Sequence, residues 1–219
     1  MTDEPQVRRV SRRGLLAMCD RLDGRPGRAT YVGGECLFEA PMEAVRVIPP
    51  FPLAHQAAYE ERVETGPLRD LLLAPRTVAL VAVRLGGYGA AVYRDEEPIA
   101  IRNGTRFVKN RNRKGGSSSG RFARRRGEQA RDLHDRAAEL VAEVIGPHAA
   151  HVDHLILAGD RLALQAVTER SRLLQSLLSL QIPLAIDVPG DPRRATFEGL
   201  AREVWSSEVM RIAGPPDPV

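Results

Sequence analysis

The residue types best suited to chemistry lie in one basic segment rich in glycine and serine, residues 109–126. Gly115 and Gly116 remove side chains, so backbone amides there can approach a ligand closely. Ser117, Ser118 and Ser119 follow with small hydroxyl groups, and arginines and lysines on both sides can neutralise phosphates. The segment therefore predicts a nucleic-acid contact, and the plainer interpretation is a solvated Gly/Ser linker.

Positive charge is concentrated in the same part of the chain. The formal net charge is +4, but residues 102–126 contain ten basic residues and no acidic one, which leaves −6 for the remainder. An acidic body with one strongly basic segment suits a polyanion, and nucleic acid first. The residues that we expect to hold phosphates are Lys109, Arg111, Arg113, Lys114, Arg121, Arg124, Arg125 and Arg126.

Two other motifs favour structure over chemistry. The glycine-rich turn at residues 85–89 lacks the spacing of a dinucleotide-binding loop and the Lys-Ser/Thr of a Walker loop, so it predicts a hairpin turn. His148, His151 and His154, with Asp153, offer metal ligands on paper. Their spacing is not that of a helical histidine pair, so the sequence predicts no metal site.

Acid–base or nucleophilic chemistry is a further alternative. Asp160 follows one predicted strand and Asp187 ends another, where α/β enzymes often place catalytic groups. Ser117, His134 and Asp160 could be assembled into a triad, but no nucleophile elbow supports it. We expect the two aspartates to cap helices instead. A small-molecule α/β enzyme that uses either aspartate stays as the third hypothesis.

The periodicity of apolar residues predicts the scaffold. Strands are expected at residues 44–48, 78–83, 89–94, 99–108, 154–158 and 182–188. Helices are expected at residues 11–22, 64–73, 121–144, 160–180 and 196–209. Three strands joined by tight turns form an antiparallel meander, and the strand–helix–strand–helix order after it indicates parallel strands with crossover helices. The expected fold class is α/β, with a mixed sheet.

Length and composition bound the organisation of the chain. The 219 residues suit a main domain at 71–210, a small and partly helical N-terminal extension at 1–70, and a disordered tail at 211–219. No apolar run approaches the ~20 residues of a membrane span, and the N-terminus has no secretory h-region. Cys19 and Cys36 make neither a disulfide framework nor a zinc quartet. We expect a cytoplasmic protein with reduced cysteines.

Residues 113–126, RKGGSSSGRFARRR, resemble the GGQ loop and following helix of the central domain of eukaryotic and archaeal class-I peptide-chain release factors. They look closer still to the release-factor-like peptidyl-tRNA hydrolases of ribosome quality control, including bacterial members. The resemblance extends through the order of elements over residues 76–205. It implies an RNase-H-like mixed α/β fold whose mobile loop enters the peptidyl-transferase centre and helps water attack the peptidyl-tRNA ester.

The resemblance also implies partners and roles. The partners would be the large ribosomal subunit, with its rRNA, and peptidyl-tRNA, and no metal or organic cofactor is implied. In register with Arg121 and Phe122, the catalytic glutamine of these relatives falls at Ser117 or near Ser119, and the loop has no glutamine. Gly115, Gly116 and Ser117–Ser119 would be the catalytic set. The chain looks too short for codon-reading domains, so we expect action without a stop codon.

Two hypotheses follow from this substitution. In the first, serine supports hydrolysis, because its backbone N–H can still stabilise the oxyanion. In the second, the protein binds the ribosome or tRNA without catalysis, because its loop has lost the catalytic glutamine.

Overall fold

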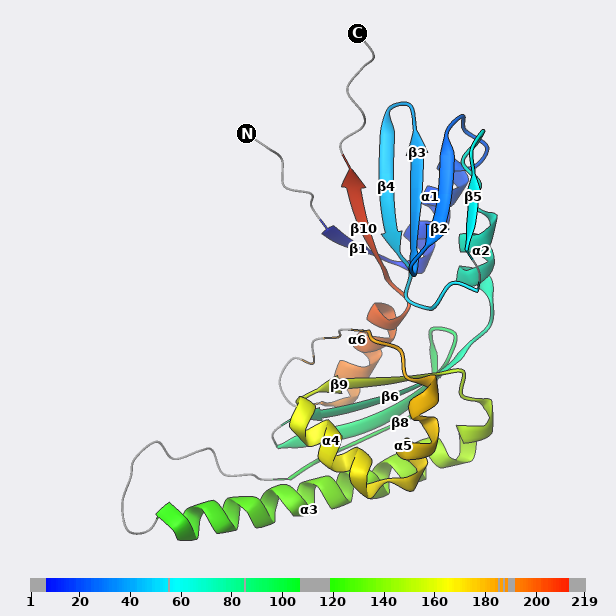
Figure 1. The fold of residues 1–219 in the computed structure, drawn as a ribbon. Helices are drawn as coiled ribbons and strands as arrows, with labels where there is room; N and C mark the ends of the chain where they lie inside the picture. The colour runs from blue at the N-terminus through cyan, green and yellow to red at the C-terminus, as the bar shows by residue number, and fades with distance from the viewer. Residues whose placement is uncertain are drawn as a thin grey trace. The chain divides into compact units, whose positions relative to one another are not determined.

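The computed structural model describes residues 7–54, 56–84, 86–106, 119–184, 186, 188 and 192–212 (Figure 1). The chain forms two compact units. The first contains the chain up to Ala74 and again from Arg202, and the second is Pro75–Ala201. Each unit has its own β-sheet with helices packed on it, so the predicted α/β class is confirmed. No helix in the described ranges is long and apolar enough to cross a membrane.

The second unit is built on a four-stranded mixed sheet in the order β8-β7-β6-β9. Strands β6 (Thr77–Arg84), β7 (Gly87–Arg94) and β8 (Glu97–Thr105) form the predicted antiparallel meander, and β9 (His154–Gly159) pairs parallel to β6. Every residue of β6 except the last is buried, as expected for a continuous apolar run in a strand covered on both faces. The mixed sheet is therefore confirmed.

Tight turns connect the meander. Arg84 pairs with Gly87, which confirms the predicted hairpin, and Gly86 in this turn has a φ of +94°. At the next turn, Asp95 has a φ of 55°. The strands therefore return immediately upon themselves, and β8, at the edge of the sheet, is the last element before the basic segment.

Helices cover both faces of this sheet. On one face lie α3 (Ser119–Ile145), α4 (Arg161–Arg170) and α5 (Arg172–Leu177), which pack apolar side chains onto alternate residues of β6 and β7. On the other face lies α6 (Arg194–Val204) (Figure 1). Its Phe197 is fully buried, and the hydroxyl of Tyr93 donates to the Phe197 carbonyl over 2.7 Å. The short 3-10 helices η1 (Gly146–His151) and η2 (Leu178–Leu180) lie next to α3 and α5.

Three predicted elements of the second half were wrong in detail. The helix expected at 160–180 is interrupted at Ser171, whose hydroxyl caps α5 by accepting from the Leu174 N–H at 3.2 Å. The strand expected at 182–188 is absent from the described residues, and one bridge joins Leu155 to Gln181 just before it. The Ile182 N–H donates to the Leu155 carbonyl, but the Leu184 N–H, the next donor on that edge, donates to the Ile182 carbonyl over 2.9 Å and so does not continue the ladder. The helix expected at 196–209 ends at Val204.

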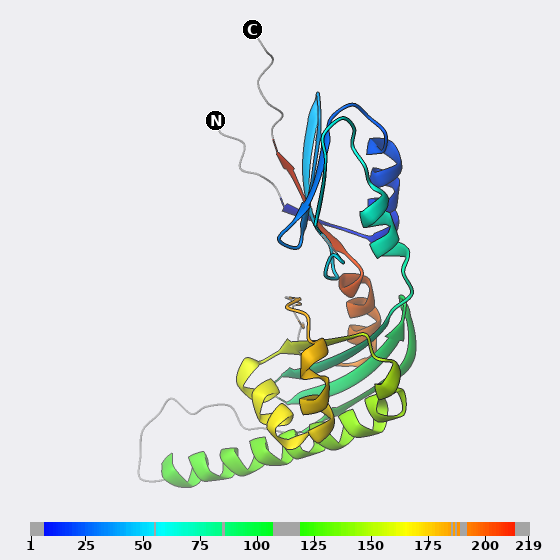
Figure 2. The ribbon, with the colours of Figure 1, turned by 45° about the vertical axis from the view of Figure 1, so that its right-hand side comes forward.

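The first unit contains a six-stranded sheet in the order β1-β10-β4-β3-β2-β5. Helices α1 (Arg12–Leu22) and α2 (Gly66–Leu73) lie against one face of it (Figure 2). Its strands are β1 (Val7–Val10), β2 (Arg28–Val32), β3 (Glu35–Ala40), β4 (Glu43–Ile48), β5 (Ala57–Tyr59) and β10 (Ser207–Ile212).

This unit differs from the expected N-terminal extension. Both helices and β4 were expected, but most of the sheet was not, and β10 inserts between β1 and β4 from the far end of the chain. Arg211 and Ile212, placed in the expected disordered tail, belong to β10, and residues 213–219 lie outside the described residues. The first unit is therefore a helix-backed β-sheet that both ends of the chain complete.

Candidate nucleic-acid interface

The structure describes the residues on either side of the predicted catalytic loop but not the loop itself. Lys109, Arg111, Arg113, Lys114, Gly115, Gly116, Ser117 and Ser118 lie outside the described residues. Arg106, just after β8, precedes them, and Ser119, the first residue of α3, follows. The structure therefore shows the strand β8 that precedes the segment and the helix α3 that follows it.

Two ion pairs tie the edge strand β8 and its end to α3. The Arg106 Nε lies 2.5 Å from the Asp132 Oδ2, and the Arg102 Nη1 lies 2.5 Å from the Glu143 Oε2. The bond from the Arg106 guanidinium holds the pKa of Asp132 below its usual range. The backbone N–H of Arg106 also donates to the Gly86 carbonyl over 2.8 Å. The exit from β8 is thus held to both the sheet and the helix.

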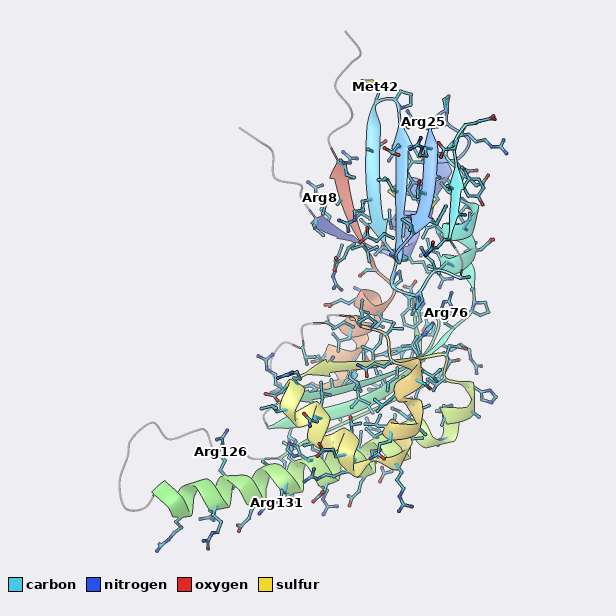
Figure 3. The ribbon with its side chains drawn as sticks, viewed as in Figure 1. Arg8, Arg25, Met42, Arg76, Arg126 and Arg131 are labelled. Atoms are coloured by element: carbon cyan, nitrogen blue, oxygen red, sulfur yellow. The ribbon has the colours of Figure 1, made fainter. Side chains whose placement is uncertain are left out.

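The first half of α3 has no buried side chain among those that the structure describes. Leu133 is the first buried one, and the helix from Ser119 to Asp132 spans about 20 Å before it. Figure 3 shows Arg126 and Arg131 on this extension, with side chains leaving the helix on different sides. This first half of α3, Ser119–Asp132, is called the arm below.

Helical periodicity sorts the arginines of the arm into two faces. Leu133, Ala137 and Val141 mark the side of α3 that faces the sheet. Arg126 lies two turns before Leu133 and points to that same side. The opposite side carries four arginines and one acidic residue, and these are Arg121, Arg124, Arg125, Arg131 and Glu128.

The electrostatics of the arm favour a polyanion. The first turn of α3 has no acidic residue, so the positive end of the helix dipole adds to the arginine charges. Arg121, Arg124, Arg125, Arg126 and Arg131 form no ion pair within the described part of the chain. By contrast, Arg102 and Arg106, which the charge count included, are engaged by acidic residues of α3. Among the described residues, the arginines of this region that form no ion pair therefore lie along the helix.

Arg131 was not among the predicted RNA-binding residues. It lies on the same side of α3 as Arg124, because it follows Arg124 by seven residues, which is two helical turns. The arginines of the arm therefore extend about one helical turn beyond Arg126, where the predicted basic segment ended. A helical projection continued past Arg126 would have found Arg131.

The residues considered for acid–base or nucleophilic chemistry have structural roles or lie outside the described residues. The Asp160 carboxylate caps α4 by accepting from the Ala163 N–H at 2.9 Å, as predicted, and Asp187 is not described. Burial lowers the pKa of His134 on α3, and Ser117, its supposed partner in a triad, lies outside the described residues. Asp160 therefore gives no support to a small-molecule active site.

The histidine group does not converge on a metal. His148 and His151 lie in η1, whereas His154 enters β9, where burial and the neighbouring Arg76 lower its pKa. The described ranges contain no group of three or more metal-binding side chains. We therefore assign these histidines no role.

A family model described as the Actinobacteria/Chloroflexi VLRF1 release factor matches residues 76–210. The chain belongs to this family. The match begins where the second unit begins and includes β6 to β9, the basic segment and α3. Membership confirms the predicted relation to release factors. A search of curated proteins finds no match.

Two archaeal structures are among the solved structures that resemble the chain. The translation termination factor aRF1 is 17% identical with a TM-score of 0.43, and the match covers 77% of this chain and 47% of that one. Pelota from Archaeoglobus fulgidus is 13% identical with a TM-score of 0.30, and the match covers 94% of this chain and 64% of Pelota. The chain thus spans about half the length of the termination factor.

Proposed function

We propose that the protein hydrolyses the ester of peptidyl-tRNA on stalled large ribosomal subunits without reading a codon. Membership in the release factor family carries the proposal, and the basic arm supports it. The partners would be rRNA and the tRNA of the large subunit, and the place of action would be the cytoplasm. Lys109, Arg111, Arg113 and Lys114 would hold phosphates together with the arginines of the arm.

Gly115 and Gly116 precede the arm closely in the sequence. Only two residues separate Gly116 from Ser119, the first residue of α3. The arm itself extends about 20 Å ahead of the core contacts at Leu133. A glycine pair directly before a basic helix in the sequence would suit delivery into a narrow, RNA-lined site.

The reaction needs few protein groups. Water adds to the ester carbonyl, the bond to the ribose oxygen breaks, and that oxygen takes a proton while the peptide leaves as a carboxylic acid. A backbone N–H at Ser117, Ser118 or Ser119 would stabilise the oxyanion, and glycine at 115 and 116 would admit the substrate closely. Serine keeps the backbone N–H but lacks the side-chain amide of glutamine. Loss of one catalytic hydrogen-bond donor costs about 10²–10³ in rate, so serine in place of glutamine predicts slow turnover.

The second candidate is a relative that binds the ribosome or tRNA without catalysis. The observation in its favour is the loop sequence itself, because residues 109–120 contain no glutamine. This candidate keeps the arm and its arginines as the binding surface and leaves the ester intact. The two proposals therefore predict the same binding and differ in peptide release.

Release of peptide from peptidyl-tRNA on isolated large subunits separates the two. We would compare the native chain with Gly116→Ala, Ser117→Gln and Ser119→Gln. Release by the native chain that Gly116→Ala abolishes supports a hydrolase that tolerates serine. Binding without release, with release gained in either glutamine variant, means that the loop is disarmed. Neither binding nor release by any of the four would contradict both proposals.

A further inference from the structure

Two ion pairs link the edge strand β8 and its end to α3 at matched spacings. Arg102 and Arg106 are four residues apart, and the Arg106 N–H bond to Gly86 continues the pairing of β8 with β7, so both side chains leave the same side of the strand. Their partners, Glu143 and Asp132, are eleven residues apart, which is three helical turns. The spacing along the strand, about 13 Å, is close to that along the helix, about 16 Å. The two pairs therefore follow α3 along β8 (Figure 1).

The ion pairs hold α3 from a different direction than its apolar side chains do. Leu133, Ala137 and Val141 belong to the buried stripe that faces the sheet. At about 100° per residue, Asp132 and Glu143 both lie about a quarter turn to one flank of that stripe. Burial of the stripe determines which side of α3 faces the sheet. The pairs on the flank oppose rolling of the helix about its axis and sideways swing.

Asp132 lies at the point where the arm joins the packed part of α3. The next residue, Leu133, is the first buried side chain of the helix among those described. From there to Ser119 the helix spans about 20 Å, so a tilt of about 10° at Asp132 would move Ser119 by about 3–4 Å. A displacement of this size matters for a catalytic group, because misplacement by about 1 Å can cost about 10²-fold in rate.

These pairs can add little to the stability of the fold. The Arg106 and Asp132 side chains are 48% and 46% exposed, and those of Arg102 and Glu143 are 66% and 58% exposed. Ion pairs this exposed contribute little to the free energy of unfolding, because water screens them. A weak tether can still select among helix orientations that bury nearly the same apolar area.

We propose that Arg106 and Asp132 are positioning residues that set the direction of the arm for its reaction on the ribosome. This inference rests on the proposed function, in which the glycine pair just before the arm in the sequence reaches the ester. Neither side chain needs to touch RNA, because Arg106 acts through Asp132 and Asp132 acts through the helix. Arg102 and Glu143 support the same orientation three turns further along α3. The pair should therefore respond to geometry and not to the sum of charge.

Single-turnover peptide release on isolated large subunits separates positioning from charge. Asp132→Asn removes a negative charge next to Arg131, so charge alone predicts tighter binding and release at least as fast as native. Loss of positioning predicts instead a saturating release rate about two- to fivefold lower, the range that exposed ion pairs contribute. The protein concentration that gives the half-maximal rate should not rise. The charge swap Arg106→Glu/Asp132→Arg keeps the net charge, restores the pair and should restore the rate.

Glu139→Gln is the matched control. It makes the same charge change on the same helix, but Glu139 pairs with Arg136, one turn earlier in α3, at 3.0 Å. Its release rate should equal that of the native chain. A native or higher saturating rate in Asp132→Asn would overturn the proposal, and so would a charge swap that leaves the rate low.

The direction of the arm can also be measured without catalysis. Nitroxide labels at Arg94→Cys in β7 and Arg124→Cys in the arm report the distance between the sheet and the helix, and the two native cysteines are fully buried. Asp132→Asn should broaden the distance distribution, whereas Glu139→Gln should leave it native. If the native chain releases no peptide, the proposed hydrolysis fails and this measurement decides alone. An unchanged distribution in Asp132→Asn would then exclude the positioning role.

Discussion

The arginines of the arm make the most quantitative prediction. Arg121, Arg124, Arg125 and Arg131 share the side of α3 that faces away from the sheet. Each phosphate contact contributes about 0.7–0.9 to the slope of log affinity against log salt, so four contribute about 2.8–3.6. From about 50 to about 200 mM salt, the native chain should therefore lose roughly 50–150-fold more affinity than a variant with glutamine at all four positions.

The assay is equilibrium binding to isolated large subunits over a salt titration. The control variant replaces four exposed arginines elsewhere in the second unit, Arg94, Arg161, Arg172 and Arg193, and changes the net charge equally. The arm variant should have the shallower slope, and the control should keep the native slope. Equal slopes for the two variants would refute the reasoning, because only net charge, and no particular surface, would then matter.

Three further predictions concern the scaffold that carries the arm. A Cβ added at Gly89 would lie 2.5 Å from the buried ring of Phe197. Gly89→Ala should therefore lower the free energy of unfolding, measured in urea, by about 1–3 kcal/mol. The double variant Gly89→Ala/Phe197→Leu should recover part of this loss. Leu133→Ala should cost about 2–5 kcal/mol in the same assay, because this 2% exposed side chain begins the core contacts of α3. Arg106 lowers the pKa of Asp132, so the stability from this pair is present above the unfolded pKa of about 3.9 and is lost as pH falls through the lower folded value. Asp132→Asn should therefore remove part of the acid sensitivity of unfolding, and an unchanged pH profile would contradict this coupling.

The second sheet could be predicted because its signals are local. The run from Val78 to Val83 is apolar throughout, and turns at Gly86 and Asp95 fix the strand connections. The long helix α3 was equally clear from its apolar spacing. In the first unit, strands β2 and β3 carry a comparable signal, since Gly33 and Gly34 join two alternating segments with φ of +61° and +84°. That hairpin could have been predicted and was missed.

Other features depend on contacts between distant residues. Strand β10 forms because Val209 pairs with Val47 of β4, and nothing in residues 196–209 alone distinguishes its end from a longer helix. The charge count likewise could not show that Arg102 and Arg106 are engaged by Glu143 and Asp132, 41 and 26 residues away. The sequence therefore predicts the basic segment but not which of its arginines form ion pairs within the fold.

The most direct test of the account is single-turnover peptide release measured over a range of protein concentrations on isolated large subunits. Binding by the arm and chemistry at the glycine pair should be separable. Gly116→Ala should abolish peptide release at saturating protein with binding nearly unchanged. Glutamine at the four arm arginines should raise the protein concentration needed for the half-maximal rate and leave the saturating rate close to native. Release that is insensitive to Gly116→Ala, or absent from a native chain that binds the subunit, would contradict hydrolysis at this loop.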